Sequence, residues 1–413
     1  MTAHVQGQWK LLQSNITNSL FDVHFVDENH GWVVGAAGTI LKTTDGGKNW
    51  QSQTSGITNS ITKVFFVDTL YGWVVSKPIT LLHTTDGGNS WNKITETLNR
   101  PLSDVWFVNR NVGWVVGGLQ LPDSPYGVIL GTTDGGMSWN ELIDSTKGVF
   151  QGIQFLNENE GWVVGGKTYF DNFDPDIILH TTNGGMDWTE QVTPTFGPLS
   201  LVYFLNNNTG WAGGSSFEGE TVALRTTNGG LSWETVHFQL GPIVSNYPIT
   251  GIASPDSNKI WLLRANELSY SADGGQTWTR KDPNESASAQ GIFFFNPNHG
   301  WLVGTNGSIW KYSEPIVSVA SFTVKPEATI LEQNFPNPFN SATKIFFRLN
   351  EGGFLSMKVY NMLGLEVRTL ANDFYHSGLH SVIFDANGLP TGTYYYKILI
   401  NGKTQTNKMV YLK

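Results

Sequence analysis

Two stretches decide the fold: residues 25–35 read Phe25-Val26-Asp27-Glu28-Asn29-His30-Gly31-Trp32-Val33-Val34-Gly35, and residues 43–50 read Thr43-Thr44-Asp45-Gly46-Gly47-Lys48-Asn49-Trp50. The first pattern returns, once in degraded form, around Trp73, Trp114, Trp162, Trp211, Trp261 and Trp301. The second returns at the turns that end with Trp91, Trp139, Trp188, Trp233 and Trp278. The first three tryptophans of the first pattern are 41 residues apart. This spacing is typical of a four-stranded propeller blade.

One repeat predicts four short strands. Residues 22–25, 32–34 and 39–42 form the first three, and the residues after Trp50 form the fourth. The Asp-Gly-Gly sequence between the third and fourth strands favours a tight turn, because glycine adopts positive φ and an aspartate oxygen caps backbone N–H groups. The tryptophan that follows can fold back and bury its ring on the sheet.

The number of repeats predicts a closed ring. Seven Gly-Trp-type positions occur, but only six Asp turns, because the unit around Trp301 runs into residues 305–311 without one. The missing fourth strand is available at the N-terminus, where residues 8–12 contain Trp9. We therefore predict an all-β, seven-bladed propeller over residues 1–313, with an N-terminal strand closing the last blade and no open edge between the ends.

Composition narrows the function classes. The 413 residues include no cysteine, which excludes disulfides and thiolate sites, and their net charge of -9 disfavours nucleic acid as a partner. No apolar run approaches the roughly 20 residues of a membrane-spanning helix. The first six residues lack the basic and apolar parts of a signal peptide. Helical periodicity is almost absent.

The repeats resemble a known group. Thr-Thr-Asp-Gly-Gly-x-x-Trp turns are Asp boxes, or bacterial neuraminidase repeats, and together with Phe-Val-Asp-x-x-x-Gly-Trp-Val-Val-Gly they resemble the propeller of the photosystem II assembly and stability factor family over residues 8–312. The resemblance implies an assembly role with a photosystem reaction-centre protein as partner. Asp boxes also occur as structural turns in sialidases, xyloglucan hydrolases and sortilin-type receptors.

The Asp-box residues predict turn caps. They are Asp45, Asp86, Asp134, Asn183, Asn228 and Asp273. Because an amide replaces the carboxylate in two of the six turns, a shared role as general base is disfavoured. We assign no catalytic residue to them.

A sialidase-like site is also disfavoured. Such a site needs three arginines around the substrate carboxylate. The propeller region holds Arg100, Arg110, Arg225, Arg264 and Arg280. The strand assignment places Arg110 on the opposite face from Arg100 and Arg264. A different glycan-active hydrolase, which needs only two carboxylates, remains the alternative.

We predict the binding surface where the repeats lengthen. Residues 119–127, 167–176 and 215–220 are insertions between the second and third strands of three consecutive units, so they share one rim. Exposed aromatics with carboxylates there suit a protein or glycan ligand. The predicted ligand-binding residues are Tyr126, Tyr169, Phe170, Asp171, Phe173, Asp174, Asp176, Phe217 and Glu218, beside Asp123 and Glu220. We predict no cofactor; calcium at Asp171, Asp174 and Asp176 is a weaker alternative, because their spacing matches no standard loop.

The C-terminal region changes character after residue 313. Residues 314–328 read as a linker, and residues 329–413 predict a small antiparallel, Ig-like β-sandwich with strands at 344–349, 355–360, 380–384, 393–400 and 404–412. Its motifs resemble the type A C-terminal sorting domain of the type IX secretion system of Bacteroidetes and related bacteria. The motif residues include Asn334, Pro336, Pro338, Gly364, Gly392, Tyr394 and Lys408. The resemblance implies the type IX machinery as partner and a secreted or cell-surface location. An ordinary Ig-like structural module is the alternative.

Overall fold

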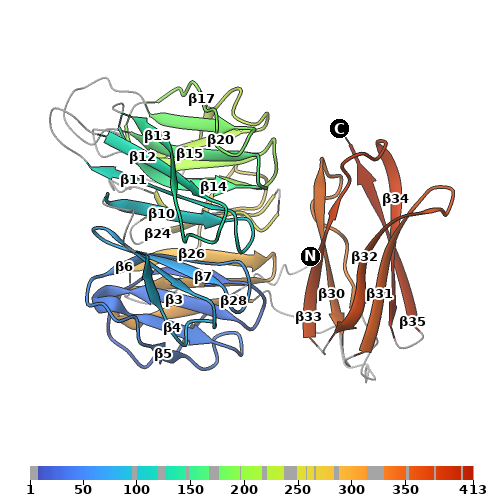
Figure 1. Ribbon diagram of the computed structural model, residues 1–413, viewed down its shortest axis with the longest axis horizontal. Coiled ribbons are helices and arrows are strands. Elements are labelled where there is room, and N and C mark those ends of the chain that lie inside the picture. Colours follow the sequence, from blue (N-terminus) through green and yellow to red (C-terminus); the bar gives the residue numbers. More distant parts are fainter. Residues whose placement is uncertain are drawn as a thin grey trace. The chain divides into compact units, whose positions relative to one another are not determined.

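The computed structural model describes residues 8–94, 100–119, 126–145, 148–166, 176–195, 197–215, 221–236, 249–256, 258–264, 267–282, 288–313, 330–349, 353–375, 378–400 and 403–412. The chain divides into two compact units, Met1–Pro315 and Ile316–Lys413. Each unit is built from antiparallel strands (Figure 1). The only helical elements in the described residues are two single 3₁₀ turns, η1 (Ala36–Gly38) and η2 (Thr305–Gly307).

The described part of the first unit forms seven four-stranded sheets, which we number along the chain. Sheet 1 contains β2 (Leu20–Phe25), β3 (Gly31–Gly35), β4 (Ile40–Thr43) and β5 (Gln51–Gln53); sheet 2 contains β6 (Ile61–Phe66), β7 (Gly72–Ser76), β8 (Thr80–Thr84) and β9 (Asn92–Ile94); sheet 3 contains β10 (Leu102–Phe107), β11 (Gly113–Leu119), β12 (Tyr126–Thr132) and β13 (Asn140–Ser145). Sheet 4 contains β14 (Val149–Phe155), β15 (Gly161–Gly166), β16 (Ile177–Thr181) and β17 (Thr189–Glu190); sheet 5 contains β18 (Leu199–Phe204), β19 (Gly210–Ser215), β20 (Thr221–Thr226) and β21 (Glu234–Thr235). Sheet 6 contains β22 (Ile249–Ala253), β23 (Ile260–Arg264), β24 (Glu267–Ser271) and β25 (Thr279–Arg280). Sheet 7 contains β26 (Ala289–Asn296), β27 (His299–Gly304), β28 (Ile309–Ser313) and the N-terminal β1 (Gln8–Leu12).

The ends of the first unit are joined by β1. It pairs with β28 of the last sheet, as the sequence predicts, and Trp9 lies opposite Tyr312 in antiparallel register. The first strand of every sheet also contacts the first strand of the next sheet, and β26 contacts β2, so the cycle of contacts closes. The last sheet therefore packs on the first, with β26 and β27 against β2.

Stacked aromatic rings connect neighbouring sheets. In sheet 6, Trp261 lies on Phe294 of sheet 7 with centroids 5.6 Å apart. In five other sheets, the tryptophan of the second strand stacks closely on the phenylalanine that ends the first strand of the next sheet. These pairs are Trp32–Phe66, Trp73–Phe107, Trp114–Phe155, Trp162–Phe204 and Trp301–Phe25, with ring centroids 3.5–3.6 Å apart. Sheet 6 departs from the rule, because the buried Ser254 stands where the other first strands have phenylalanine. This substitution leaves Trp211 without the equivalent partner.

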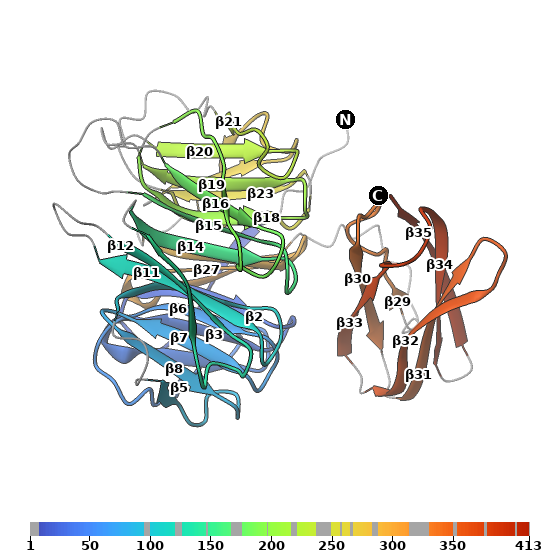
Figure 2. The same cartoon turned by 45° about the horizontal axis from the view of Figure 1, so that its top comes forward.

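The second unit has two sheets that share one core. One contains β29 (Ile330–Leu331), β30 (Ala342–Leu349) and β33 (Gly378–Asp385); the other contains β31 (Gly353–Asn361), β32 (Glu366–Tyr375), β34 (Gly392–Ile400) and β35 (Lys403–Tyr411). Figure 2 shows β30 and β33 on one side of this unit and β34 and β35 on the other. Alternate residues of the two sheets, such as Ile345, Phe347, Met357, Val359 and Tyr396, are fully buried between them.

The sequence prediction missed a long strand here. β32 spans ten residues that the sequence analysis left between a turn and the strand at 380–384. Its pairing with β31 contains two register shifts, at Met357/Lys358 and Val359/Tyr360. Each such bulge reverses the inward and outward alternation, so β32 lacks the period of two that marks a strand in sequence.

Candidate functional site

The first unit has two distinct faces at the ends of its strands. We call the turn face the side that carries the connections between first and second strands and between third and fourth strands. We call the rim face the opposite side, where the first strands begin and the second strands end. Antiparallel order places the strand ends that flank the predicted insertions on the rim face and the Asp turns on the turn face.

On the turn face, each Asp-turn side chain caps its own turn. Asp45 Oδ1 accepts the hydroxyl of Thr43 at 2.9 Å and the N–H of Asn49 at 2.9 Å. Asn183 and Asn228 accept the equivalent hydroxyl and N–H groups through their amide oxygens. Because the amide makes the same contacts as the carboxylate, the charge is not needed for the cap.

These caps lower the pKa of several aspartates. Hydrogen bonds from the Ser90 side chain and N–H lower the pKa of Asp86 to about 2, and Ser138 does the same for Asp134. The equivalent bonds from Thr277 lower the pKa of Asp273 to about 2. A carboxyl with this pKa stays ionised at neutral pH, which suits a turn cap and opposes a role as proton donor.

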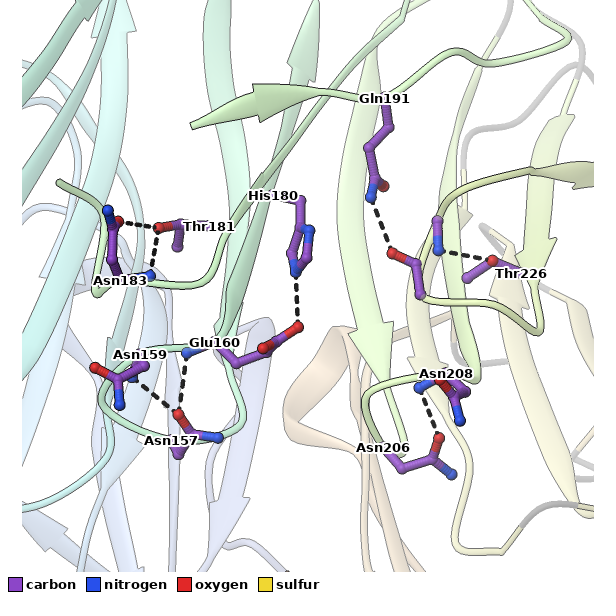
Figure 3. A network of polar contacts seen from close by, with 12 residues as sticks. Asn157, Asn159, Glu160, His180, Thr181, Asn183, Gln191, Asn206, Asn208 and Thr226 are labelled. Atoms are coloured by element: carbon purple, nitrogen blue, oxygen red, sulfur yellow. Dashed lines mark hydrogen bonds and ion pairs between the residues drawn. The ribbon is translucent and has the colours of Figure 1, made fainter. Parts of the chain in front are cut away.

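The turns of each sheet are also bonded to one another. In sheet 4, Asn157 accepts the N–H groups of Asn159 and Glu160 at 2.9 and 3.0 Å, and the Asn159 carbonyl accepts the N–H of Gly184 at 2.9 Å. His180 bonds Glu160 at 2.7 Å, as Figure 3 shows. The same turn-to-turn bond recurs in all of sheets 1–6. The polar groups of the turn face therefore serve mainly to hold the sheets.

Three side chains around sheet 3 form a cluster that begins at the rim face with Arg100 and Tyr126 and reaches along the sheet to Glu141. The Arg100 guanidinium lies over the Tyr126 ring, 5.3 Å from its centroid, and pairs with Glu141 at 3.3 Å. Arg100 precedes β10, Tyr126 begins β12, and Glu141 lies in β13. All three are partly exposed, so an aromatic surface and both signs of charge meet at one accessible point.

The turn face carries a cluster of the same composition. Arg110 lies over the Tyr71 ring at 4.1 Å and pairs with Asp68 at 2.6 Å. Its position on the opposite face from Arg100 agrees with the strand assignment made from sequence. This second cluster joins sheets 2 and 3, whereas the Arg100 cluster lies within one sheet.

Asp176 differs from its predicted environment. The sequence predicts it in the exposed rim, but only 2% of its surface is exposed, at the position directly before β16. The Thr195 hydroxyl donates to Asp176 Oδ2 at 2.5 Å, while Oδ1 is buried and has no hydrogen-bond partner among the residues that the structure describes. Burial raises the pKa of Asp176 to about 6 in spite of the Thr195 bond.

The innermost strands carry a charged cluster that the sequence analysis did not single out. Asp22 accepts the N–H of Val64 at 3.0 Å, and Asp104 accepts the N–H of Ile153 at 3.1 Å, each on the first strand of a following sheet. Burial raises the pKa of both aspartates. Burial also opposes the charge of Lys63, but the neighbouring charges of Asp104 and Asp22 outweigh it and raise the Lys63 pKa.

A comparison of the repeats could have revealed this cluster. Residues aligned with Asp22, Lys63 and Asp104 in the remaining first strands are Gly152, Leu201, Gly251 and Gly291. Charges in three consecutive repeats at a position that is otherwise glycine or leucine are a recognisable departure from the pattern.

The remaining arginines do not gather around one point. Arg264 pairs with Glu267 at 2.9 Å, and Arg280 pairs with the same Glu267 at 3.0 Å and with Asp282. Arg225 lies on β20, opposite Glu234 of β21. Carboxylates on neighbouring strands thus engage the arginines of sheet 6, away from Arg100 in sheet 3.

Most of the predicted rim lies outside the described residues. This applies to Tyr169, Phe170, Asp171, Phe173, Asp174, Phe217 and Glu218, and to Asp123 and Glu220. The calcium alternative depends on two of them and stays a prediction.

The motif residues of the second unit are mostly structural in their contacts. Asn334 is buried and donates through its side chain to the Pro336 carbonyl at 3.0 Å and to Thr343 at 2.9 Å. Tyr394 is buried and donates its hydroxyl to the Pro390 carbonyl at 2.6 Å. Pro338 is exposed, Gly364 lies in the β31–β32 turn at φ 75°, Gly392 begins β34, and Lys408 lies in β35.

Segment 331–340 covers one edge of the larger sheet. The N–H of Val410 donates to the Asn337 side chain at 2.8 Å, and Phe339 exchanges backbone bonds with Val410 and Leu412. These contacts connect the beginning of the second unit to its last strand and protect the edge of β35.

Two family models match the chain. The model described as photosynthesis system II assembly factor YCF48 matches residues 1–102 and 94–196. The model described as secretion system C-terminal sorting domain matches residues 333–412. The chain thus joins repeats of the YCF48 type to a C-terminal sorting domain, as the motifs indicate.

Curated relatives match over short segments. The photosystem II assembly protein Ycf48 of Thermosynechococcus vestitus is 40% identical over 43 residues, which are 10% of this chain and 12% of the relative. The photosystem II stability/assembly factor HCF136 of Guillardia theta is 30% identical over 105 residues, 22% of this chain and 27% of the relative. The matched segments therefore span little more than a quarter of these relatives at most.

Solved structures support the propeller fold. YCF48 bound to D1 peptide is similar with a TM-score of 0.58 and 24% identity, over 76% of this chain and 99% of that chain. PorZ of Porphyromonas gingivalis, an essential surface component of the type IX secretion system, has a TM-score of 0.52 and 13% identity, over 96% of this chain and 60% of that chain. At these identities the likeness shows the fold alone.

Proposed function

We propose that this chain is an exported, seven-bladed β-propeller that binds a protein or glycan ligand on its rim face. Residues 1–313 form the propeller, residues 314–328 a linker, and residues 329–413 an Ig-like sandwich that acts as the sorting signal. The match of residues 333–412 to a secretion sorting family indicates export, to the cell surface or the medium. The described residues contain no helix long and apolar enough to cross a membrane.

The contrast between the two faces carries the proposed binding site. The turn face uses its polar groups in repeated bonds between turns, whereas the rim face holds the partly exposed Arg100 and Tyr126, with Arg100 paired to Glu141, and the buried Asp176, which bonds Thr195 through one carboxylate oxygen. An aromatic ring beside both signs of charge suits stacking on a sugar or on a peptide side chain. A buried carboxylate oxygen without a partner costs roughly 1–3 kcal/mol, and such costs concentrate at functional sites.

The matched arginine clusters provide the test. Arg100→Ala and Tyr126→Ala should each weaken ligand binding at least tenfold on a glycan array, or in a pull-down from medium and outer-membrane fractions for a protein ligand. Arg110→Ala and Tyr71→Ala remove an equivalent cluster from the turn face and should leave binding unchanged. Equal effects of both pairs, or no effect of either, would place the ligand elsewhere.

A glycan-active hydrolase is the second candidate, and Asp176 is the observation that favours it. A carboxyl with a pKa of about 6 is in the range of a general acid at neutral pH. Such an enzyme also needs a second carboxylate across the glycosidic bond. A reducing-sugar release assay on the glycans that bind separates the candidates, because release that Asp176→Asn abolishes would establish the enzyme.

The export role has its own test. Deletion of residues 329–413 should leave the propeller inside a host that has a type IX system, measured as the fraction of protein in the medium and on the cell surface. Normal export of the truncated chain would refute the sorting role.

A further inference from the structure

The turn between β31 and β32 exposes three apolar side chains together. Met362, Leu363 and Leu365 are 74%, 84% and 61% exposed. None of them belongs to the hydrophobic core of the second unit. We call these three residues the apolar tip.

The apolar tip is held in a defined conformation. Asn361 Oδ1 accepts the N–H groups of Leu363 and Leu365, each at 3.0 Å, and the Asn361 carbonyl accepts the N–H of Gly364 at 3.0 Å. The N–H of Asn361 donates to the Leu365 carbonyl at 3.0 Å. Gly364 has φ 75°, a conformation that glycine adopts without strain. Four bonds therefore fix the backbone at the point where the side chains project into solvent.

Local structure does not require these apolar residues. The turn depends on the Asn361 side chain and on Gly364, while positions 362, 363 and 365 contribute only backbone groups. Turns in soluble proteins normally place polar residues at such positions. Other exposed apolar side chains of this unit, such as Phe354, Ile383 and Leu412, lie on different strands or at the chain end. Three exposed apolar side chains within four residues of one hydrogen-bonded turn are the kind of feature that marks an interaction site.

We propose that the apolar tip inserts into an apolar pocket of a protein of the export machinery, and so provides a contact by which the sorting domain is recognised. The inference rests on the proposed sorting role, and it names the surface involved. Two observations select this occupant. The tip lies within residues 333–412, which match a family defined by sorting, and a sorting signal acts only by contact with another protein. The opposite edge of the same sheet is already covered by segment 331–340 of the chain itself.

The experiment uses the full chain in a host with a type IX system. The combined variant Met362→Ser, Leu363→Ser and Leu365→Ser should lower the exported fraction at least tenfold, whereas the conservative Leu363→Met should retain export. Phe354→Ser with Ile383→Ser removes two equally exposed apolar side chains outside the tip and should be exported normally. Normal export of the tip variant would overturn the proposal.

Two further measurements keep the result interpretable. Thermal unfolding of each purified variant should match the wild type, because the replaced side chains lie outside the core; if the combined variant unfolds early, the single variant Leu363→Asn, which favours the turn, decides in its place. Loss of a wild-type dimer in the tip variant on gel filtration would instead make a second copy the occupant and overturn the proposal. If the tip variant is exported but the chain lacking residues 329–413 stays inside the cell, only this inference is refuted. If both are exported, the sorting role itself is refuted.

Discussion

The ring of Trp301 lies flat on the ring of Phe25, with centroids 3.5 Å apart and planes 11° from parallel. Trp301 belongs to the last sheet of the first unit and Phe25 to the first, so this pair joins the ends of the ring. The ring of Trp50 is perpendicular to that of Phe25, with centroids 6.1 Å apart. The same group of three rings recurs at internal junctions, for example where Phe66 contacts Trp32 and Trp91.

Phe25→Ala should destabilise the first unit by about 3–5 kcal/mol, because it leaves a cavity between two buried tryptophans. Urea unfolding followed by tryptophan fluorescence measures the change. Phe66→Ala is the matched control, since it removes the same stack at an internal junction and should cost a similar amount. A much smaller cost for Phe25→Ala would mean that the junction between the last and first sheets contributes little.

The turn caps allow a prediction about Asp-to-Asn substitution, because both residues already occur at this position in the repeats. In wild type, Asp134 Oδ1 accepts the Thr132 hydroxyl at 2.8 Å and the Ser138 N–H at 2.9 Å. Asp134→Asn should cost less than about 1 kcal/mol, because Asn183 and Asn228 make these bonds with an amide oxygen. Asp134→Ala removes the acceptor and should cost about 1–3 kcal/mol. Denaturant midpoints of the two variants test the order, and equal losses would contradict it.

Much of this arrangement could be predicted from sequence because it is repeated. The spacing of the tryptophans and the position of Trp9 predict the sheets and the pairing of β1 with β28. The capping role follows from the exchange of Asp for Asn at one repeated position. Phe25 and its equivalents occur in the repeat too, but which ring they stack on depends on the neighbouring sheet and is not encoded in one unit.

Non-local contacts explain what the sequence did not predict. Asp176 stands at the end of an acidic insertion, which suggested exposure, but its partner Thr195 lies 19 residues further on, in the connection to the next sheet. Tyr126 was predicted for the rim, whereas its neighbours Arg100 and Glu141 come from other strands of the sheet. In the second unit, the extra residues in β32 interrupt the alternation of buried and exposed residues by which strands are found.

The charged cluster on the innermost strands should depend on its lysine. Lys63→Met leaves Asp22 and Asp104 without their nearby cation. We expect the free energy of unfolding to fall by about 2–4 kcal/mol at pH 7. This loss is smaller than for a fully buried ion pair, because all three side chains are partly exposed. The penalty should shrink as the pH falls and the two carboxyls take up protons. Lys63→Arg, which keeps the charge, serves as the control in urea unfolding at pH 7 and pH 5. A pH-independent penalty would show that packing of the side chain, not its charge, is responsible.

The raised pKa of Asp176 predicts how the stability of the first unit changes with pH. Its pKa is raised from 3.8 to about 6 in the folded protein, so the native state binds a proton more tightly than the unfolded chain does. The group therefore destabilises the native state above pH 6, and this penalty disappears as the pH falls from about 6 to about 4. Asp176→Asn removes the ionisation, keeps the size of the side chain and retains an acceptor for the Thr195 hydroxyl. It should stabilise the first unit by about 2–3 kcal/mol at pH 8, with a gain that falls toward zero near pH 4.

Thr195→Val, which removes the hydrogen bond that favours the ionised form, should shift stability in the opposite direction at pH 8. Unfolding free energies of wild type and both variants between pH 4 and pH 8 test this, and a constant difference across that range would mean that Asp176 does not titrate there.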